Sequence, residues 1–530
     1  MTAARSDSAT PTDDSVTTLE SLRAVVRLRL GIDPRALAAF RIGLGLIVLC
    51  DLLVLRLPGL VTFYTDAGIF PRSALKGLSP ALAKWSLHAL SGSAWAQGLL
   101  LAITGIFAAC VLVGYRHRLA AVSTALLLAS LHARNPYLVN GGDTILISLL
   151  LLAAVLPLAA RWSLRPRRLE SRFASGEHRD DSRVVSTATA ILCLHIVVIY
   201  AINAILKFRS DAWLSGVAVQ RIFRLEDFVD HAGPTVAEFP ALLTAINWLW
   251  IAVLAASVLL VVAPGRLRTA TVAAFVGAHL SMAATMRLGV FPFVMVAVLL
   301  VFLPPRVWDR LERLVSASGL EGHLESLMGR EATGTTGPEA TASGMNRGTG
   351  TLEAANAETG PTAAGSRVSP RVRRGTRIAA SALLVCLFLA VVSWQVAAAG
   401  LVDTSASSDD GALGSASWAF FAPDPPDSYS WYVVEATDES GTATDLVTGD
   451  PATFERPDNA MDRYPTTLWK RYGTKGQGAG DAALESAGAY FCDRAPDGTE
   501  SVTIYRVEQP VDADGPVGEP IPHEKVTRAC

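Results

Sequence analysis

The amino-acid sequence predicts an all-α polytopic membrane bundle of about nine transmembrane helices, followed by a small β-rich domain outside the membrane. The 530 residues are 51% hydrophobic and only 18% charged, and the mean hydropathy is +0.35, values that argue against an ordinary soluble protein. Apolar runs long enough to cross a bilayer recur along the chain. The tail from Leu401 onward is instead acidic, with 23 Asp and Glu against 9 Lys and Arg, which argues against nucleic acid as a partner.

Residues 1–32 precede the first apolar run. Residues 1–20 are small and polar and have no apolar segment behind a basic one, which is typical of a disordered head and not of a signal peptide. Residues 22–30 alternate Leu or Val with three arginines and predict a short amphipathic helix on the membrane surface. Asp33 and Pro34 predict a helix start, with an N-cap followed by proline at the first helical position.

Nine apolar runs follow, and a helix needs about 20 residues to cross about 30 Å of hydrocarbon. We place the predicted transmembrane helices at residues 36–56, 95–114, 119–134, 143–160, 188–207, 242–263, 268–286, 289–304 and 377–399. Arginines gather before the first run, between the second and third, after the fourth, sixth and eighth, and before the ninth. Nine crossings put all of them on one side, which predicts a multi-pass cell-membrane protein with a cytoplasmic N-terminus and an extracytoplasmic C-terminus.

The runs divide the chain into domains. Residues 33–315 hold the first eight predicted helices, and residues 316–376 are rich in Gly, Thr, Ala and Ser, which predicts a disordered cytoplasmic linker. The ninth helix, 377–400, leads into the acidic extracytoplasmic domain, 401–530. Within that domain we expect strands at residues 429–434, 489–492 and 502–507, and a turn at 438–441.

Four of the six cysteines lie in apolar runs, where cysteine behaves as a small hydrophobe. Cys492 and Cys530 are the only two in the tail, and they form a disulfide if the tail faces an oxidising compartment; otherwise the terminal Cys530 is free. The cysteines show no metal-ligand spacing, and we predict no metal site.

Lys207, at the end of the fifth apolar run, is a candidate catalytic base. The chain has 46 basic residues, yet lysine occurs at few positions and arginine is the rule. Arginine stays protonated in proteins, whereas a lysine amine acts as a base when poor solvation lowers its pKa. His195 and Tyr200 precede Lys207, and Trp213 follows it. The alternative is a snorkelling lysine, with its stem in lipid and its head at the interface.

Other polar residues lie in or near the predicted spans. Arg41 lies inside the first span, where an arginine either has a partner or snorkels to the interface, and Asp66 follows that span. Asn140 and Asp143 open the fourth span, and Asp143 either caps the helix or contributes to a polar floor inside the bundle. His279 lies near the turn between the seventh and eighth spans.

Several motifs follow one another along the chain: PRALAAFRIGLGLIVLCDLL with FYTDAGIFPR, ARNPYLVNGGDTILISLLLLAAVLPLAARWSL, IYAINAILKFRSDAWLSGVAV and WAFFAPDPPDSYSWYVV. In this order they closely resemble the HTTM (horizontally transferred transmembrane) domain family, which is similar to the vitamin K-dependent γ-glutamyl carboxylases. The resemblance covers residues 35–305 and 377–450. In the carboxylases, a lysine after a transmembrane helix, followed by Asp and Trp, is the base acting on the quinol, and a histidine precedes a Gly-x-Phe-Pro turn. Lys207 with Asp211 and Trp213 stands at the first of these places and His279 at the second. Asn140 to Asp143 replace the carboxylases' Asn-Asn-His.

The resemblance implies a quinol-linked carboxylase or epoxidase. A reduced quinone of the menaquinone or vitamin K type enters between helices, and Lys207 takes its hydroxyl proton. Attack by oxygen then makes a strong base, which abstracts a hydrogen from an acceptor, a secreted or membrane protein. The implied catalytic residues are Lys207, His279 and Asp143, and the residues implied to bind quinone or substrate are Trp213, Tyr200, Asn140, Arg41 and Asp66. The alternative is a non-catalytic module that binds lipid or quinone and presents the outer domain to a partner.

Overall fold

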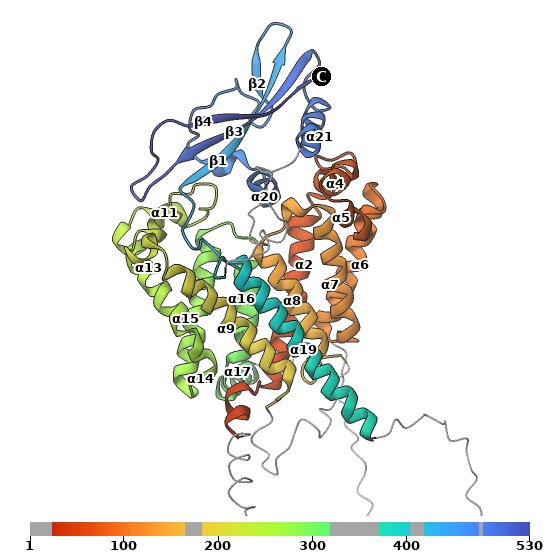
Figure 1. Ribbon diagram of the computed structural model, residues 1–530, viewed down its shortest axis with the longest axis vertical. Helices are drawn as coiled ribbons and strands as arrows, with labels where there is room; N and C mark the ends of the chain where they lie inside the picture. Colours follow the sequence, from red (N-terminus) through yellow and green to blue (C-terminus); the bar gives the residue numbers. More distant parts are fainter. Residues whose placement is uncertain (1–23, 165–182, 319–369, 403–417, 476–480) are drawn as a thin grey trace, which may run out of the picture. The chain divides into compact units, whose positions relative to one another are not determined.

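The protein is mostly helical, with one small antiparallel sheet near its C-terminus (Figure 1). The computed structural model describes residues 24–164, 183–318, 370–402, 418–475 and 481–530. The predicted disordered head and most of the predicted linker lie outside the described residues. A helical turn at residues 24–30 falls within the predicted amphipathic segment.

A helical segment lies at each place where the sequence predicted a transmembrane helix. The segments are α2 (Pro34–Cys50) continued by the π-helix η1 (Asp51–Arg56), α6 (Ala94–Val113), α7 (His117–Arg134), α8 (Gly141–Val155), α9 (Thr187–Lys207), α13 (Pro240–Ala255) continued by η4 (Ala256–Val258) and α14 (Leu259–Val262), α15 (Gly265–Thr285), α16 (Phe291–Leu299) continued by η5 (Leu300–Phe302), and α19 (Pro370–Ala398). Shorter helices connect them: α3 (Leu60–Tyr64), α4 (Arg72–Leu78), α5 (Pro80–Trp85), α10 (Asp211–Leu214), α11 (Ala218–Ile222), α12 (Gly233–Ala237) and α17 (Pro305–Ala317).

Five helices of the described chain are long and apolar enough to cross a membrane, or up to six if the broken pair that begins at Phe291 is one span. The five are Pro34–Arg56, Ala94–Val113, Thr187–Lys207, Pro240–Val262 and Arg374–Ala398. A multi-pass helical membrane protein is therefore confirmed, and nine crossings are not. The predicted spans that fall short are either brief or polar: α8 has 15 residues and α16 has 9, while α7 and α15 contain arginines and histidines.

Local sequence sets where the helices begin. The Asp33 side chain accepts a hydrogen bond from the backbone N–H of Arg35 at 2.8 Å, with Pro34 in the first turn, which confirms the predicted start of α2. Helix α9 begins with a capping box between Ser186 and Thr189, whose side chains bind each other's backbone N–H groups. These caps satisfy N–H groups that have no partner within the helix.

The described chain forms two compact units. Residues Met1–Pro304 and Val385–Cys530 belong to the first unit, and Pro305–Leu384 form the second, which contains α17 and the first half of α19. Within the first unit, α2 packs on α6, α6 on α7, and α7 on α8, while α16 contacts both α2 and α8.

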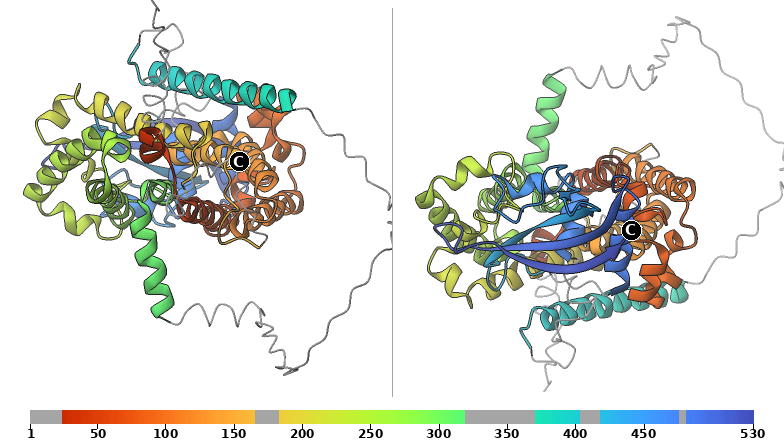
Figure 2. Two further views of the ribbon diagram at one scale, coloured as in Figure 1. Left: turned by 90° about the horizontal axis from the view of Figure 1, so that it is seen from below. Right: turned by 90° about the horizontal axis from the view of Figure 1, so that it is seen from above.

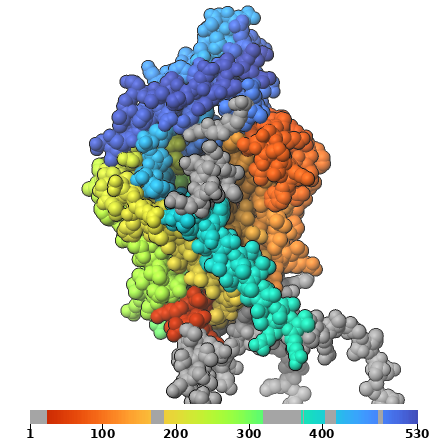
Figure 3. All heavy atoms as spheres, in the orientation of Figure 1, coloured from red at the N-terminus to blue at the C-terminus, as the bar shows by residue number. Residues whose placement is uncertain are grey.

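The C-terminal sheet has the strand order β2-β1-β3-β4, and all neighbouring strands are antiparallel. The strands are β1 (Ser428–Asp438), β2 (Ala443–Asp445), β3 (Thr499–Pro510) and β4 (Ile521–Ala529). Trp431 pairs with Val507 across β1 and β3, and both side chains are buried in a core that also contains Leu225 from the loop after α11. Seen from above, the strands cross the ends of the helices (Figure 2), and the space-filling view shows them covering that end of the first unit (Figure 3).

Two of the three strands predicted for the tail are confirmed, and one is wrong. Residues 429–434 lie in β1 and residues 502–507 in β3, but residues 489–492 end the helix α21 (Asp481–Cys492). The aromatic pair Tyr490 and Phe491 suggested a strand, whereas the preceding DAALESAGA is rich in good helix formers and its buried residues Ala483 and Ala487 have helical spacing.

Cys492, the last residue of α21, is bonded to Cys530 after the last strand, and the bridge closes a sequence separation of 38 residues. It joins α21 to the edge of the sheet formed by β4. The other four cysteines are free thiols, in keeping with their apolar surroundings in the sequence.

We predict that replacing Cys530 by Ser lowers the unfolding free energy of the tail by about 4 kcal/mol, because a bridge across about 38 residues restricts the unfolded chain. Hydrogen exchange of the β3 and β4 amides, followed by mass spectrometry, measures the loss. Cys386→Ser, which removes a free thiol, is the matched control and leaves exchange unchanged. Equal exchange in Cys530→Ser and wild type would contradict the prediction.

Candidate functional site

Lys207 ends α9, and its side chain is buried, with 1% exposure for the residue. Its Nζ donates a hydrogen bond to the carbonyl oxygen of Phe420 at 2.7 Å and a longer one to that of Phe421 at 3.4 Å. The amine also lies 4.4 Å from the centroid of the Trp213 ring. Within the described residues, no ion pair joins Lys207 to a carboxylate. Lys207 is therefore a buried amine bound by neutral groups and is not a lysine that snorkels into water.

The segment Trp418–Phe421, which comes after α19 in the sequence, lies against the end of α9. Asn203, one helical turn before Lys207, donates to the Trp418 carbonyl at 2.7 Å and accepts from the Phe420 N–H at 3.1 Å. The indole N–H of Trp213 donates to the Phe421 carbonyl at 3.0 Å. Asn203 and Lys207 thus hold the same backbone from one helix face, as their spacing of four residues allows. That spacing is the signal by which the sequence could have indicated Asn203.

Aromatic rings connect this segment to His279. The Phe420 ring lies 4.4 Å from the Phe291 ring, and Phe291 lies 5.7 Å from His279, measured between centroids. His279 lies 6.0 Å from Tyr200, which stacks on Phe275 at 4.2 Å. Lys207, His279 and Tyr200 therefore belong to one continuous region of packed, buried side chains, although no hydrogen bond joins the three within the described chain.

Two buried polar atoms in this region have no hydrogen-bond partner among the described residues, the hydroxyl of Tyr200 and Nε2 of His279. The other ring nitrogen of His279 is hydrogen-bonded to the Phe275 carbonyl at 2.7 Å, which fixes the ring. Buried polar groups normally have partners, so these two atoms are available to a water or a polar ligand, as are other buried atoms outside this aromatic region, such as both ring nitrogens of His132. His195 is not part of it, because its Nε2 is 3.2 Å from the Ser148 hydroxyl and its ring packs on Trp418.

A second buried cluster consists of four charged side chains. Arg56 is ion-paired with Asp51 and with Asp143, both at 3.1 Å, and Arg471 from the tail is ion-paired with Asp143 at 3.0 Å. None of the four side chains is more than 7% exposed. Arg56 also donates to the Tyr64 hydroxyl at 2.9 Å. Opposite charges and good hydrogen bonds offset the cost of removing these groups from water.

The π-helix η1 brings the first ion pair together. Asp51 and Arg56 are its first and last residues and are five positions apart, which matches the i to i+5 hydrogen-bond spacing of this element. In an α-helix, side chains three or four positions apart share a face, whereas side chains five positions apart, such as these two, point to different faces. The local change of helix type therefore positions both charges toward Asp143.

The Asn140 and His279 motifs meet beside this cluster. Asn140 and Asp143 form a capping box at the start of α8, so Asp143 caps the helix and binds two arginines at once. Gly142 lets Phe291 approach, since a Cβ there would lie 2.7 Å from the Phe291 side chain. Gly289 has φ +65°, and a side chain on it would collide with Arg471. Phe291 thus separates the ion cluster from the aromatic region of His279.

Arg41 and Asp66 lie in neither cluster. Arg41 is fully buried in the first half of α2. Its guanidinium donates to the carbonyls of Val111 and Leu112, in the last turn of α6, and to that of Trp162. Arg41 thus supplies hydrogen-bond donors to the end of α6. Asp66 is 39% exposed and pairs with Arg72 at 2.7 Å. Burial tends to raise the pKa of Asp66, but the hydrogen bonds from Arg72 hold it below its usual value.

The tail contributes charged residues that the sequence did not single out. Lys470 precedes Arg471 in α20 (Thr467–Lys475) and lies 3.9 Å from Asp227, in the loop between α11 and α12. Burial lowers the pKa of Lys470 to about 7, although the Asp227 charge opposes that shift, and burial raises the pKa of Asp227. The rarity of lysine in the chain could have indicated Lys470 as a candidate. Its partner Asp227 could not be predicted, because it lies far away in the sequence. Among the described residues, no group of three or more His, Cys, Asp or Glu is placed to hold a metal.

A protein-family model described as the HTTM domain matches residues 30–308, more than half of the chain. The chain belongs to the HTTM family. The HTTM domain therefore includes α2 to α16 and supplies Lys207, His279, Asp143 and Arg56, whereas Arg471 and the Trp418–Phe421 segment come from the chain that follows it. Neither the curated proteins nor the solved structures gave a match to the chain.

We predict that Asp143→Asn destabilises the protein by about 3 to 5 kcal/mol, because it leaves Arg56 and Arg471 buried without their shared carboxylate. Asparagine keeps the shape and the hydrogen-bond acceptor of the capping box, so the loss reports the charge. Denaturant unfolding in detergent, followed by near-UV circular dichroism, measures it. The control Glu485→Gln removes the exposed partner of Arg528 and costs less than about 1 kcal/mol. Equal losses in the two variants would contradict the prediction.

Proposed function

We propose that this HTTM protein is a quinol-dependent membrane enzyme of the carboxylase or epoxidase type, in which Lys207 is the base and a secreted or membrane protein is the acceptor. The setting of the amine is the observation that carries the proposal. A neutral amine has two N–H donors and one lone pair. With its donors directed at the carbonyls of Phe420 and Phe421, the lone pair remains available for a proton.

The surroundings of Lys207 favour the neutral, basic form before reaction. Burying an ammonium ion without a carboxylate is costly, and no carboxylate among the described residues is ion-paired with this one. Once the amine has taken a proton, the Trp213 ring at 4.4 Å stabilises the positive charge by a cation–π interaction. The carbonyls of Phe420 and Phe421 also form stronger hydrogen bonds with the protonated amine than with the neutral amine.

The residues present fit a quinol head group. Tyr200 and His279 each have a buried polar atom without a partner among the described residues, Phe275 stacks on Tyr200, and Phe291 and Trp250 pack around His279. These residues would hold the ring by stacking and its oxygens by hydrogen bonds. A bound quinol supplies reducing equivalents and the hydroxyl proton that Lys207 removes. Asp143 is committed to Arg56 and Arg471, so its role is to position α8 and Phe291 and not to transfer a proton.

The alternative function is a quinone- or lipid-binding module without catalysis. One observation favours it: the hydrogen bonds of Lys207 to the Trp418–Phe421 segment also suffice for a purely structural lysine that fixes this segment. The two functions differ in whether the amine must accept a proton.

We predict that Lys207→Gln lowers the rate of quinol oxidation at least about 100-fold while quinone still binds, because a positioned general base contributes about that much. Glutamine can donate two N–H groups to the Phe420 and Phe421 carbonyls but is not a base. The measurement is aerobic oxidation of a short-chain menaquinol by purified protein, followed by absorbance, together with quinone binding followed by fluorescence quenching.

Lys84→Gln, on the exposed face of α5, is the matched control and keeps the wild-type rate. Thermal unfolding in detergent shows whether Lys207→Gln folds. If wild type and a folded Lys207→Gln oxidise quinol equally, or if neither binds quinone, the proposal is wrong. Quinone binding without protein-dependent oxidation in wild type would favour the module.

We also propose that the chain crosses the membrane nine times, with the N-terminus in the cytoplasm and the tail outside. The distribution of arginines and the nine helical segments support this arrangement. The bond between Cys492 and Cys530 supports an oxidising compartment for the tail.

Under this topology, a cysteine introduced at Ser440 reacts with a membrane-impermeant maleimide in intact cells. A cysteine at Ser318 reacts only after lysis. Both positions are exposed, and the parent protein provides the background from its native thiols. The opposite labelling pattern would reverse the orientation, and equal labelling of the two would exclude an odd number of crossings between them.

A further inference from the structure

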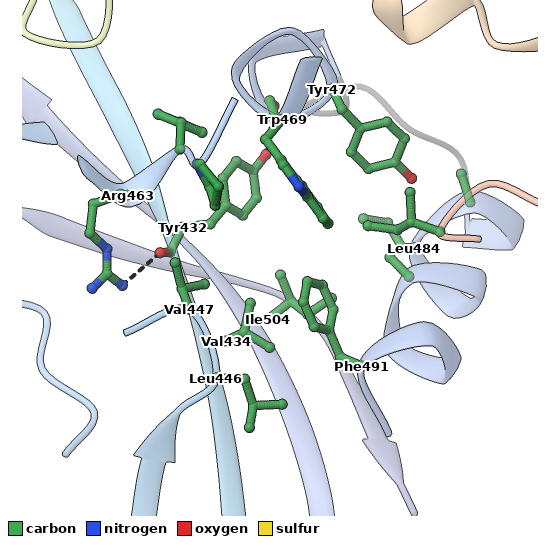
Figure 4. Close-up of a pocket in the computed structure, with 16 residues that line it drawn as sticks. Tyr432, Val434, Leu446, Val447, Arg463, Trp469, Tyr472, Leu484, Phe491 and Ile504 are labelled. Atoms are coloured by element: carbon green, nitrogen blue, oxygen red, sulfur yellow. Dashed lines mark hydrogen bonds between the residues drawn. The ribbon is translucent and has the colours of Figure 1, made fainter. Parts of the chain in front are cut away.

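A cavity of about 190 Å³ lies in the tail between the sheet and two helices (Figure 4). Its walls are mostly aromatic and aliphatic: Tyr432 and Val434 come from β1, Ile504 from β3, Trp469 from α20, and Leu484 and Phe491 from α21. No residue of the Lys207 region lines it, so an inference about this cavity stands apart from the quinol proposal.

Most polar groups in the cavity wall already have partners. The Tyr432 hydroxyl donates to the Gly473 carbonyl at 2.8 Å, and the Tyr464 hydroxyl donates to the Ser430 carbonyl at 2.7 Å. The Arg463 guanidinium binds the Tyr432 carbonyl and the Asp445 carboxylate. These bonds leave mainly apolar surface for a ligand. The Tyr472 hydroxyl and Nε of Arg463 are among the polar atoms of the wall residues that make no hydrogen bond to another described residue (Figure 4).

The cavity adjoins the end of the helical bundle. Ile69, from the loop that follows α3, forms part of its wall. Trp469 packs on Phe63 of α3 with ring centroids 5.1 Å apart, and Tyr472 packs on Tyr137 at 5.7 Å. Apolar residues thus continue from the cavity wall to the helix ends that face the tail.

We infer that this cavity binds a hydrocarbon chain, either the acyl chain of a lipid or the isoprenyl chain of a quinone. A hydrocarbon chain requires no hydrogen-bond partners and gains free energy when its surface leaves water. A peptide segment would bring backbone N–H and C=O groups that need partners, and the committed polar groups of this wall do not supply them. The position beside the bundle end places the cavity near the membrane, where such chains are concentrated.

The test is photolabelling of the purified full-length protein with two probes, a stearic acid that carries a mid-chain diazirine and a geranylgeraniol that carries a diazirine. We expect labelled peptides between residues 463 and 491, mapped by mass spectrometry. Label from the stearic acid alone indicates a lipid source, and label from the isoprenoid alone indicates a quinone source; either supports the inference.

Ala487→Phe tests the site itself, because Ala487 lines the cavity and is 5% exposed. A phenyl ring there fills apolar space, so we expect loss of the label with no fall in thermal stability. Val517→Phe, at a residue that is 48% exposed and outside the cavity, is the control and keeps the label. Labelling of Ala487→Phe at the wild-type level, or no labelling of the wild-type cavity by either probe, would overturn the inference. If Ala487→Phe does not fold, Leu484→Trp provides the same test from the neighbouring turn of α21.

Discussion

The structure depends on the shared carboxylate of Asp143. It holds Arg56 of the first helix and Arg471 of the tail, and at the same time it caps α8. Buried charges are tolerated only when each has a partner of opposite charge. Removal of one charged side chain leaves its partners buried and uncompensated. Asp51 completes the set, so two carboxylates face two guanidinium groups. The ion pair of Arg471 with Asp143 therefore holds the tail against the helices, in addition to the apolar contacts of the tail.

Lys207 contrasts with these arginines. Arg56 and Arg471 are always protonated and are matched by carboxylates, which makes them structural. Lys207 is equally buried but has carbonyls and an indole ring as neighbours, so its environment does not require it to be charged. Phe291 lies between the two regions, against Gly142 on one side and against Phe420 and His279 on the other. The ion cluster can thus set the position of the aromatic region without exchanging a proton with it.

Much of this arrangement was predictable from residue type and local pattern. The amine of Lys207, the capping role of Asp143 and the place of His279 before a Gly-x-Phe-Pro turn all stand out in the sequence, as does the resemblance to the HTTM family. The partners were not predictable, because Arg471 lies 328 positions from Asp143 and the Phe420 carbonyl lies 213 positions from Lys207. Arg41 was named as a ligand-binding residue for a related reason. A buried arginine indicates a hydrogen-bond acceptor nearby, and here the acceptors are backbone carbonyls at the end of another helix.

Helix α20 shows how one short element connects these regions. Its nine residues place Trp469 and Tyr472, three positions apart, along the wall of the tail cavity, as a helical face requires. Arg471, between them in sequence, enters the ion cluster, while Lys470 reaches Asp227 in the loop before α12. Consecutive side chains on a helix point about 100° apart, so these contacts use different faces and cannot be exchanged by a small rotation. A displacement of α20 caused by a chain in the cavity would therefore also strain the pair of Arg471 and Asp143, and through α8 and Gly142 it would reach Phe291.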